Sequence, residues 1–405
     1  MMKYVITGNG VAGTTAAAFI RKIDNDGMIT IISDETYPFY SRIRLIDFLS
    51  GDVDEKSIIL KKDTWYEENK INLILNTAVT DMDIAKKELT ISHDKKLKYD
   101  KLLMATGGIP FVPAIAGADK KGVFTLRTLK DAIAIREYAG MGNKRLLIIG
   151  GGVLGLEAGN ALRKSGISVA VVEFFARLLP RQMDPDGADI LRTQMEQMGF
   201  RFYLGTKTEE IFGADKVEGV LLEDGRRVAC DMIIISAGVR PNATLAQKAG
   251  LKIEKGLIVN DRMKTELPDI YAAGDLIQHR GVFYGIWPAA EKQGEVAGIN
   301  MAGGNAVYKG TTISNFLKIA GVGLVAAGNI DAEGNHESIV IKDPGKFIYK
   351  KLVIRENRII GTILYGDIKD MRRIVKAIEN RTDISAIRNE LEKWNLEGLT
   401  QSSKD

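Results

Sequence analysis

Short runs of consecutive apolar residues, each followed by a glycine cluster, recur along this chain. The first run covers residues 4–6; a glycine-rich turn follows, and a helical pattern then continues to about Arg21. A second apolar run covers residues 29–32. Apolar runs of this length on either side of a helix are typical of buried parallel strands. The pattern therefore predicts a strand–helix–strand unit at the start of the chain.

The same order of elements recurs further along the chain. Residues 146–149 form an apolar run, residues 150–155 a glycine turn, residues 156–164 a helical pattern and residues 169–172 another apolar run. The chain therefore carries two units of the same strand–turn–helix–strand type.

Two further apolar runs each lead into a glycine-containing turn. Residues 102–104 precede A-T-G-G, and residues 232–236 precede A-G-V-R-P-N. We interpret each as a strand that leads to a point where the chain crosses between domains.

The last part of the chain has a different pattern. Residues 350–354 and 359–364 are expected to form strands around the turn Glu356–Asn357. Apolar residues with helical spacing follow at 370–379 and 384–394. This succession predicts a separate, small α+β domain.

Length, charge and cysteine content narrow the class of protein. A chain of 405 residues is too long for one hydrophobic core and indicates two or three domains. A net charge of +4 at this length does not indicate a nucleic-acid-binding protein. The single cysteine, Cys230, excludes an internal disulfide and a cysteine-ligated metal cluster. The three histidines are widely separated in the sequence, and we therefore expect no metal site.

The same features bear on the compartment. One cysteine in 405 residues fits a reducing environment. The opening M-M-K-Y-V-I-T-G has too short an apolar run for a signal peptide. Since no apolar stretch is long enough to cross a bilayer, we expect a cytoplasmic protein without a membrane span.

The first glycine motif, G-N-G-V-A-G, follows the first strand and opens the first helix. Its first glycine permits a tight turn, its second lets a pyrophosphate approach the backbone, and its third allows close helix packing. The helix N-terminus then meets the phosphate charge. An acidic pair ends the second strand, and either acid is expected to hold a ribose hydroxyl, although each can also be a solvated turn residue. The binding residues expected here are Gly8, Gly10, Val11, Ala12, Gly13, Asp34 and Glu35.

The second glycine motif, G-G-G-V-L-G, has the same context, and Glu173 ends its second strand. A carboxylate at this place accepts from a ribose 2′-hydroxyl and repels a 2′-phosphate. Arg177 lies four residues on and can weaken that repulsion. We therefore expect NAD rather than NADP. The binding residues expected here are Gly150, Gly152, Val153, Leu154, Gly155 and Glu173.

Two such units imply two bound dinucleotides. One is a hydride donor, and FAD is the dinucleotide that accepts a hydride. We therefore predict an α/β fold with two dinucleotide-binding, Rossmann-like domains and a small α+β C-terminal domain. The expected boundaries are 1–112 and 239–311 for a discontinuous FAD-binding domain, 113–238 for the NAD-binding domain and 312–405 for the C-terminal domain.

Five motifs in this order resemble those of the pyridine-nucleotide flavoprotein oxidoreductases with two dinucleotide-binding domains. They are G-N-G-V-A-G, Y-D-K-L-L-M-A-T-G-G, L-L-I-I-G-G-G-V-L-G-L-E-A-G, S-A-G-V-R-P-N and D-I-Y-A-A-G-D. The resemblance covers about residues 1–305. It implies that Asp275, the end of the last motif, hydrogen-bonds the ribitol of FAD.

The resemblance implies further contacts with the cofactors. Arg42, in Y-S-R-I-R-L, matches a residue near the flavin and the pyrophosphate, and Val79 matches a valine whose backbone meets adenine. Glu157 matches an acid that faces the nicotinamide pocket. Trp287 starts a helix whose N-terminus is expected to face the pyrimidine end of the flavin; its side chain either covers the flavin or packs in the protein. The remaining implied contacts are Ala105, Thr106, Gly107, Arg127, Gly238 and Gly274.

The chain departs from several relatives of this fold. Disulfide reductases carry C-x4-C after the first strand–helix–strand unit, and peroxidase and oxidase relatives carry one cysteine there, but residues 44–51 contain none. Ferredoxin-reductase relatives often have a lysine where this chain has Ile46–Asp47. We therefore expect no thiol relay and no catalytic side chain, and we interpret Cys230 as structural.

The narrower resemblance is to NADH:rubredoxin reductases and to the flavin-binding part of NADH-dependent nitrite reductases. L-K-I-A-G-V at 317–322 and K-L-V-I at 351–354 resemble their small C-terminal domain. This implies an oxidoreductase that passes a hydride from NADH to FAD and then single electrons to rubredoxin or another iron-containing carrier. Two other interpretations stay open: the flavin subunit of a larger iron–sulfur enzyme, and a non-enzymatic NADH-responsive redox sensor.

Basic residues gather in the C-terminal part of the sequence. They are Lys342, Lys346, Lys350, Lys351, Arg355 and Arg358. An exposed basic face would attract an acidic iron protein. We therefore expect the acceptor to dock partly through these residues.

Overall fold

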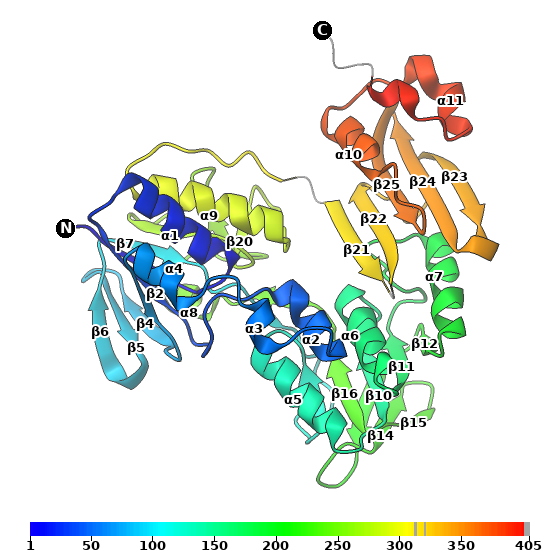
Figure 1. Ribbon diagram of the computed structural model, residues 1–405, viewed down its shortest axis with the longest axis horizontal. Helices are drawn as coiled ribbons and strands as arrows, with labels where there is room; N and C mark the ends of the chain where they lie inside the picture. The colour runs from blue at the N-terminus through cyan, green and yellow to red at the C-terminus, as the bar shows by residue number, and fades with distance from the viewer. Residues whose placement is uncertain (312–313, 320, 401–405) are drawn as a thin grey trace. The chain divides into compact units, whose positions relative to one another are not determined.

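The computed structural model describes residues 1–311, 314–319 and 321–400 (Figure 1). Contacts divide the chain into two compact units. The first unit comprises Met1–Phe48, Val53–Phe111 and Val239–Thr311, and the second comprises Leu49–Asp52, Val112–Gly238 and Thr312–Asp405. Ala320 of the L-K-I-A-G-V stretch, and residues 312, 313 and 401–405 of the expected C-terminal domain, lie outside the described residues. The finer division into three domains stays a prediction.

A parallel sheet forms the centre of the first unit. Its strand order is β19-β7-β1-β2-β3. The strands are β1 (Lys3–Thr7), β2 (Met28–Ile32), β3 (Ile71–Ile74), β7 (Lys101–Met104) and β19 (Ile270–Ala272). The strands expected at 4–6, 29–32 and 102–104 are confirmed. Consecutive residues of these strands are buried because both faces of the sheet are covered.

Helix α1 (Val11–Ile23) joins β1 to β2, and Figure 1 shows it beside α9 (Trp287–Met301). Small residues allow this close approach: a Cβ built on Gly294 would lie 2.4 Å from the carbonyl oxygen of Ala12. α9 begins at Trp287 with Pro288 as its second residue, as predicted.

Shorter elements complete the first unit. Its remaining strands are β4 (Val79–Asp83), β5 (Glu88–Ile91) and β6 (Lys95–Lys98) in one antiparallel sheet, β8 (Gly108–Pro110) paired with β17 (Val239–Pro241), and β18 (Leu257–Val259) paired with β20 (Ile277–His279). The short helices are α3 (Glu55–Ile58), α4 (Asp63–Glu68) and α8 (Thr244–Lys248), and α2 (Leu45–Ser50) lies at the boundary of the two units.

The second unit repeats the parallel sheet of the first. Its order is β12-β11-β10-β16-β9, in which β16-β10-β11-β12 repeats the arrangement β7-β1-β2-β3 of the first unit. The outer strand differs: β9 precedes the other strands of its sheet in the chain, whereas β19 follows those of the first sheet. The strands are β9 (Val123–Thr125), β10 (Arg145–Ile149), β11 (Ser168–Glu173), β12 (Arg201–Leu204) and β16 (Met232–Ile235). The helices are α5 (Leu129–Gly140), α6 (Val153–Lys164) and α7 (Pro185–Gln197), and β13 (Thr208–Phe212), β14 (Gly219–Leu222) and β15 (Arg227–Ala229) form an antiparallel sheet.

An antiparallel sheet forms the C-terminal part of the second unit, in the order β21-β22-β25-β24-β23. The strands are β21 (Ser314–Ile319), β22 (Val322–Gly328), β23 (Glu337–Asp343), β24 (Ile348–Arg355) and β25 (Arg358–Tyr365), and the helices are α10 (Met371–Glu379) and α11 (Arg388–Glu392). The hairpin predicted around Glu356–Asn357 is confirmed, with φ values of 51° and 54° in the left-handed region that tight hairpin turns use. The last helix is shorter than expected, because a 3₁₀ turn at Ser385–Ile387 replaces its first turn.

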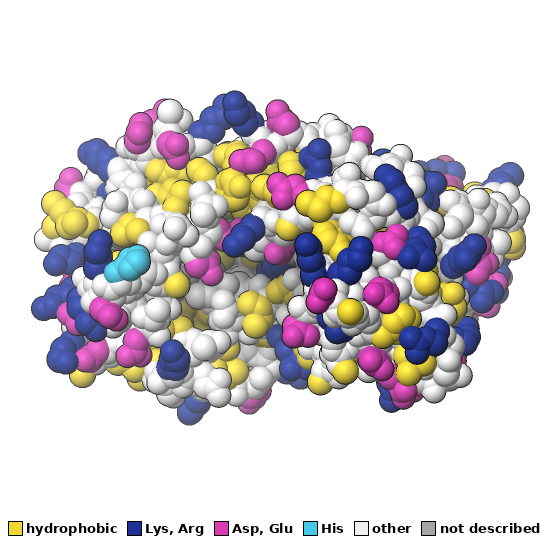
Figure 2. All heavy atoms as spheres, turned by 90° about the horizontal axis from the view of Figure 1, so that it is seen from below, with side chains coloured by type: hydrophobic (Ala, Val, Ile, Leu, Met, Phe, Trp, Pro, Cys, Tyr) yellow, Lys and Arg dark blue, Asp and Glu magenta, His cyan; other side chains and the backbone are white. Residues whose placement is uncertain are grey.

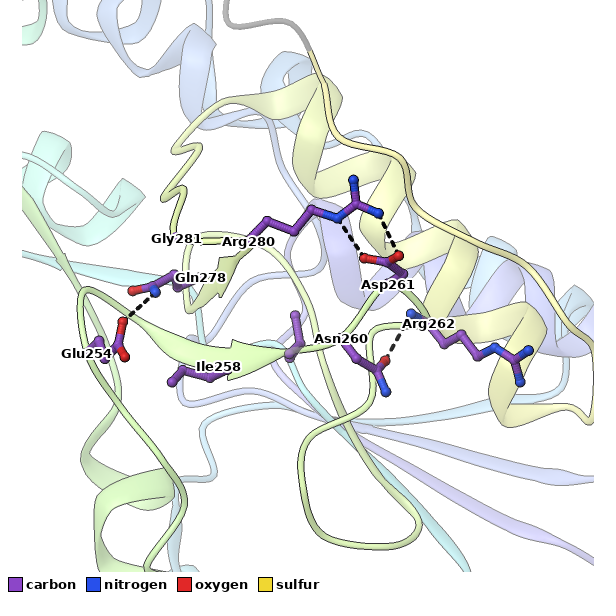
Figure 3. Close-up of a pocket in the computed structure, with 9 residues that line it drawn as sticks. Glu254, Ile258, Asn260, Asp261, Arg262, Gln278, Arg280 and Gly281 are labelled. Carbon is purple, nitrogen blue, oxygen red and sulfur yellow. Dashed lines mark hydrogen bonds and ion pairs between the residues drawn. The ribbon is translucent and has the colours of Figure 1, made fainter.

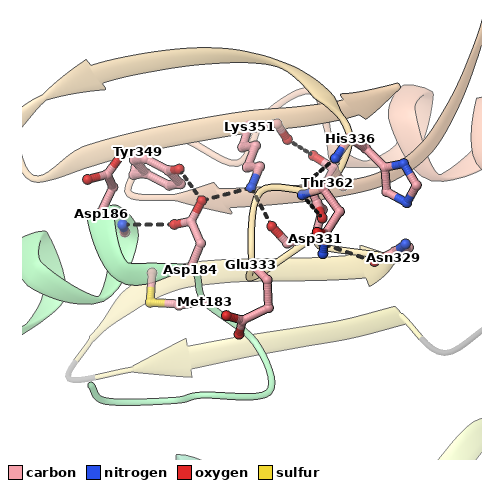
Figure 4. A network of polar contacts seen from close by, with 12 residues as sticks. Met183, Asp184, Asp186, Asn329, Asp331, Glu333, His336, Tyr349, Lys351 and Thr362 are labelled. Carbon is pink, nitrogen blue, oxygen red and sulfur yellow. Dashed lines mark hydrogen bonds and ion pairs between the residues drawn. The ribbon is translucent and has the colours of Figure 1, made fainter. Parts of the chain in front are cut away.

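A buried polar network joins this sheet to α7 (Figure 4). Asp184, the N-cap of α7, accepts from the hydroxyl of Tyr349 at 2.5 Å and from Nζ of Lys351 at 3.0 Å. The same Nζ donates to the carbonyl oxygen of Asp331 at 2.9 Å. Burial, followed by the hydrogen bond to Asp184, raises the pKa of Tyr349 far above its usual value. An ion pair with this many hydrogen bonds is satisfied in the interior and fixes the start of α7.

Among the described residues, no helix combines the length and the apolar character that a membrane crossing requires.

Candidate functional site

The first glycine turn fits a bound pyrophosphate. Gly8 has φ +119°, and a Cβ there would lie 2.1 Å from the carbonyl oxygen of Ala105. A Cβ on Gly13 would lie 2.0 Å from the carbonyl oxygen of Gly8, so neither position accepts a side chain. At Gly10, in contrast, a Cβ would meet no described atom within 4 Å. The open space therefore lies at the middle glycine, at the N-terminus of α1, where Val11 and Ala12 form the first turn.

Asn9, inside the same turn, was not among the residues expected from the sequence. Its Oδ1 accepts from the hydroxyl of Tyr66 at 2.9 Å. Its Nδ2 is buried and has no partner among the described residues. A buried donor in this state is the kind that a ligand oxygen satisfies. The one available sequence signal was an amide side chain between two glycines of the motif.

Glu35 and Arg42, two predicted FAD residues, form an ion pair. Glu35 also accepts from the hydroxyl of Tyr40, whereas Asp34 is exposed. Burial acts to lower the pKa of Arg42, but Tyr40, Glu35 and Asp275 outweigh it and raise that pKa. The charges of Glu35 and Asp275 therefore both act on the guanidinium of Arg42.

The loop that carries Asp275 is held by α9. Gly274 has φ +82°, and its N–H donates to Oε1 of the buried Gln293 at 2.9 Å. Trp287, at the start of α9, packs against Phe39 with ring centroids 5.8 Å apart. Since Trp287 keeps part of its surface exposed, this packing leaves it able to cover a ligand as well.

The two segments expected to cross between domains, which follow residues 102–104 and 232–236, are hydrogen-bonded to each other. The hydroxyl of Thr106 donates to the carbonyl oxygen of Asn242 at 2.8 Å, and the N–H of Asn242 donates to the carbonyl oxygen of Gly107 at 2.8 Å. Ala105 is buried beneath Gly8. Val79, the first residue of β4, is partly buried against the core of the first unit. These four predicted residues therefore have structural contacts of their own.

The second glycine turn has the geometry of the first. Gly150 has φ +113°, and a Cβ there would lie 2.4 Å from the carbonyl oxygen of Ser236. A Cβ on Gly155 would lie 2.6 Å from the carbonyl oxygen of Gly150. At Gly152 a Cβ would again meet no described atom within 4 Å. The second turn therefore also leaves open space beside the N-terminus of its helix, α6, which begins with Val153 and Leu154.

Glu173 is 7% exposed and lies against this turn. Its two oxygens accept from the backbone N–H of Gly151 at 2.6 Å and of Phe175 at 2.8 Å. Arg177 is occupied elsewhere: its guanidinium donates to the carbonyl oxygens of Met183 and Pro180 and pairs with Glu333 at 3.4 Å. In the described part of the chain Glu173 forms no ion pair, and its role toward a 2′-phosphate stays a prediction.

The other residues expected in the second unit are placed as follows. Glu157 lies on α6, and Gly238, with φ +113°, follows β16. Arg127 precedes α5, and its backbone N–H donates to Asp131 at 2.9 Å. Their roles toward a cofactor stay predictions.

A pocket of about 700 Å³ lies in the first unit, and its lining residues fall within 254–262 and 278–281 (Figure 3). Its walls include Glu254 and Asp261, which accept from Gln278 and Arg280 respectively. None of the predicted cofactor-binding residues lines this pocket. Because the acids and donors of this pocket satisfy each other, we assign it no cofactor.

The prediction of a basic docking face in the C-terminal part is wrong for its two central residues, Lys350 and Lys351. Lys350 and Lys351 are consecutive in β24, so their side chains point to opposite faces of the sheet. Lys350, 8% exposed, pairs with Asp367 at 2.6 Å, and Lys351, 5% exposed, pairs with Asp184. On the face shown in Figure 2, basic and acidic side chains are interspersed.

Comparisons with known proteins agree with this geometry. Residues 2–318 match the model of the pyridine nucleotide-disulphide oxidoreductase family, and residues 314–382 match the rubredoxin NAD+ reductase C-terminal domain. The chain is 39% identical to a nitrite reductase [NAD(P)H] of Bacillus subtilis over 94% of its own length and 48% of that protein. It thus spans about half the length of this relative. It is 32% identical to the NADH-rubredoxin oxidoreductase of Clostridium acetobutylicum over 96% of its own length and 99% of that protein.

The crystal structure of the Clostridium acetobutylicum NADH:rubredoxin oxidoreductase superposes with a TM-score of 0.84 at 30% identity, covering 97% of this chain and 99% of that one. The predicted α/β fold is thereby confirmed. The chain belongs to the pyridine nucleotide-disulphide oxidoreductase family and carries a rubredoxin NAD+ reductase C-terminal domain.

Proposed function

We propose that this chain is an FAD-dependent oxidoreductase that takes a hydride from NADH and passes single electrons to an iron protein. The observation that carries this proposal is the pair of glycine turns, each with open space at its middle glycine and an acid at or just beyond the end of the next strand. FAD, when bound, supplies hydride acceptance and one-electron release. Since residues 44–51 contain no cysteine, the proposed reaction uses no thiol.

The side chains in this proposal bind and orient the cofactors. The open backbone at Gly10 and the N-terminus of α1 take the FAD pyrophosphate, and Arg42 balances the added negative charge. Asp275 accepts from the ribitol. Glu173 accepts from the adenosine ribose of NADH. The reaction then depends on positioning rather than on an acid, a base or a nucleophile from the protein.

Rubredoxin, or a similar iron carrier, is the acceptor we favour. The relative named NADH-rubredoxin oxidoreductase aligns over nearly the whole of both chains. The single cysteine of the chain supports a reducing compartment, and we propose the cytoplasm as the place of action.

A second candidate function is the NAD-reactive flavin part of a larger iron–sulfur oxidoreductase. The relative named nitrite reductase favours it, since this chain matches 48% of that protein at the higher identity of 39%. Under this proposal the chain would co-purify with an iron–sulfur subunit, and its electrons would pass to that subunit.

Anaerobic stopped-flow spectroscopy tests the main proposal. The purified, FAD-loaded protein should bleach at the flavin absorbance with NADH and recover with oxidised rubredoxin as electrons leave. A protein that NADH does not reduce contradicts the hydride step. Fast reduction followed by slow reoxidation with every iron acceptor favours the redox-sensor interpretation instead.

An Asp275→Ala variant tests the flavin site. It removes a charge-assisted hydrogen bond worth about 1.5–3 kcal/mol, so FAD should dissociate more readily on dilution. Asp275→Asn keeps an acceptor oxygen and should lose less. Equal FAD retention in wild type and both variants would remove Asp275 from the site.

A further inference from the structure

Two consecutive aromatic side chains, Phe174 and Phe175, stand exposed on the second unit. They are 64% and 53% exposed, and their rings meet edge to face with centroids 5.4 Å apart. Isolated exposed apolar side chains are common on protein surfaces, but an adjacent aromatic pair left in water forgoes a large burial gain. The pair therefore indicates a surface that a ligand covers.

The place of the pair limits what that ligand can be. Phe174 follows Glu173 directly, at the carboxyl end of β11, the edge at which parallel sheets bind ligands. The backbone there is fixed: the N–H of Phe175 donates to Glu173 at 2.8 Å, and its carbonyl oxygen accepts from Gly205 at 3.0 Å. The two rings are thus exposed on a rigid segment beside the carboxylate proposed to hold a ribose.

We propose that Phe174 and Phe175 form the platform for the adenine of NADH. Because the two rings meet at 80°, the base stacks on the face of one ring while the other ring borders it. This inference rests on the proposed function, because it assigns the base that follows the ribose held by Glu173. A planar base stacks on aromatic faces without needing a hydrogen-bond partner. The guanidinium of Arg177 is turned to backbone carbonyls, so this edge offers aromatic surface rather than a cation.

The test compares ligands with and without adenine on the FAD-loaded protein. In Phe174→Ala/Phe175→Ala, the apparent Kd for NADH in stopped-flow flavin reduction should rise roughly fivefold or more, with an unchanged limiting rate. The inhibition constant of ADP-ribose should rise by the same factor. Reduction by reduced nicotinamide mononucleotide, which lacks adenosine, should not change.

Two further variants make the result decisive. Phe174→Tyr/Phe175→Tyr keeps both rings and should restore the affinity for NADH. Met141→Ala removes another exposed apolar side chain of the same unit, at the end of α5, and should have no effect.

Three results would overturn the platform. They are an unchanged Kd for NADH in the double alanine variant, an equal loss with reduced nicotinamide mononucleotide, or an altered assembly state by sedimentation with NADH binding intact. Each differs from failure of the proposed function, in which NADH would not reduce the wild-type flavin at all.

Discussion

The two glycine turns of this protein have nearly the same backbone and different electrostatics. In both turns a Cβ added to the first or third glycine would clash with a carbonyl oxygen at the equivalent position of the fold. A Cβ added to the middle glycine would meet open space. The acid of the first unit, Glu35, pairs with Arg42. The acid of the second unit, Glu173, accepts from two backbone N–H groups, with no ion pair among the described residues.

The difference shows how one motif can serve two ligands. In the first unit Arg42 lies within the electrostatic influence of Glu35 and Asp275, and we propose that this cation balances the two phosphates of FAD. In the second unit two backbone N–H groups donate to Glu173, and we propose that this carboxylate repels an extra phosphate. We infer that the first turn holds FAD in place, whereas the second turn selects NADH over NADPH.

Alanine at the third glycine of each turn should have the largest effect on cofactor binding and should separate the two sites. A Cβ at Gly13 would lie 2.0 Å from a carbonyl oxygen, so Gly13→Ala should lose FAD affinity by roughly tenfold or more, about 1.4 kcal/mol. Gly155→Ala, at 2.6 Å, should keep FAD and weaken reduction by NADH. Flavin absorbance after gel filtration and stopped-flow reduction measure the two effects.

The control for this pair is Gly140→Ala, at the end of α5, where a Cβ would meet no described atom within 4 Å. It should leave both sites intact. If Gly155→Ala released FAD as readily as Gly13→Ala, the assignment of one cofactor to each turn would be wrong.

A large effect on stability is expected from substitution of Lys351, whose buried ion pair with Asp184 lies within the second unit. Lys351→Met leaves the buried carboxylate of Asp184 without its cation, which should cost about 3–5 kcal/mol of the free energy of unfolding. Urea denaturation followed by circular dichroism measures the loss. Because the first unit is untouched, the folded variant should still bind FAD.

Lys346→Met is the matched control, since the exposed Lys346 pairs with Asp343 at 3.4 Å at the surface. Its cost should stay below about 1 kcal/mol. Equal costs for the two substitutions would mean that the Asp184 network does not stabilise the unit.

Cofactor choice should respond to Glu173. In Glu173→Gln the repulsion of a 2′-phosphate is removed, so the preference of kcat/KM for NADH over NADPH should narrow roughly tenfold, about 1.4 kcal/mol. Glu209→Gln, an exposed acid in β13, should leave the preference unchanged. A wild-type protein with equal kcat/KM for both cofactors would contradict the role of Glu173.

The sequence predicted the elements whose pattern is local. The two strand–turn–helix–strand units, the hairpin at Glu356–Asn357 and the start of α9 all follow from short-range periodicity, glycine and proline. The basic docking face failed because it depends on tertiary contacts. Lys350 and Lys351 look like a surface cluster in the sequence, but consecutive residues of β24 face opposite sides of the sheet. Asp367 pairs with Lys350 on one side, and Asp184 pairs with Lys351 on the other.

Asn9 and the Phe174–Phe175 pair were missed for the opposite reason. Their sequence signals are ordinary, and only the burial of one donor and the exposure of two rings make them notable. The contacts and the burial of a side chain depend on segments that are far apart in the sequence. The periodicity of a sequence therefore does not predict them.

The smallest effect on turnover is expected at Cys230, and the comparison of the two units gives the reason. Cys230 precedes Asp231 at the amino end of β16, as Tyr99 precedes Asp100 at the amino end of β7. Both aspartates accept from the backbone of the strand that precedes the glycine turn of their unit, at Arg145 and at Lys3. Cys230 therefore occupies a structural position at the sheet edge opposite to the carboxyl ends, where cofactors bind.

Burial, followed by the charge of Asp231, raises the pKa of the Cys230 thiol to about 12. The reactive thiolate is therefore scarce at neutral pH. Cys230→Ala should keep kcat/KM for NADH within about twofold of wild type, and iodoacetamide at pH 8 should not inhibit the folded enzyme. Cys230→Ser should turn over equally well but melt lower, because it buries a hydroxyl among apolar side chains. Loss of turnover in a folded, FAD-loaded Cys230→Ala protein would mean that a thiol takes part in the reaction, and the comparison with Tyr99 would then fail.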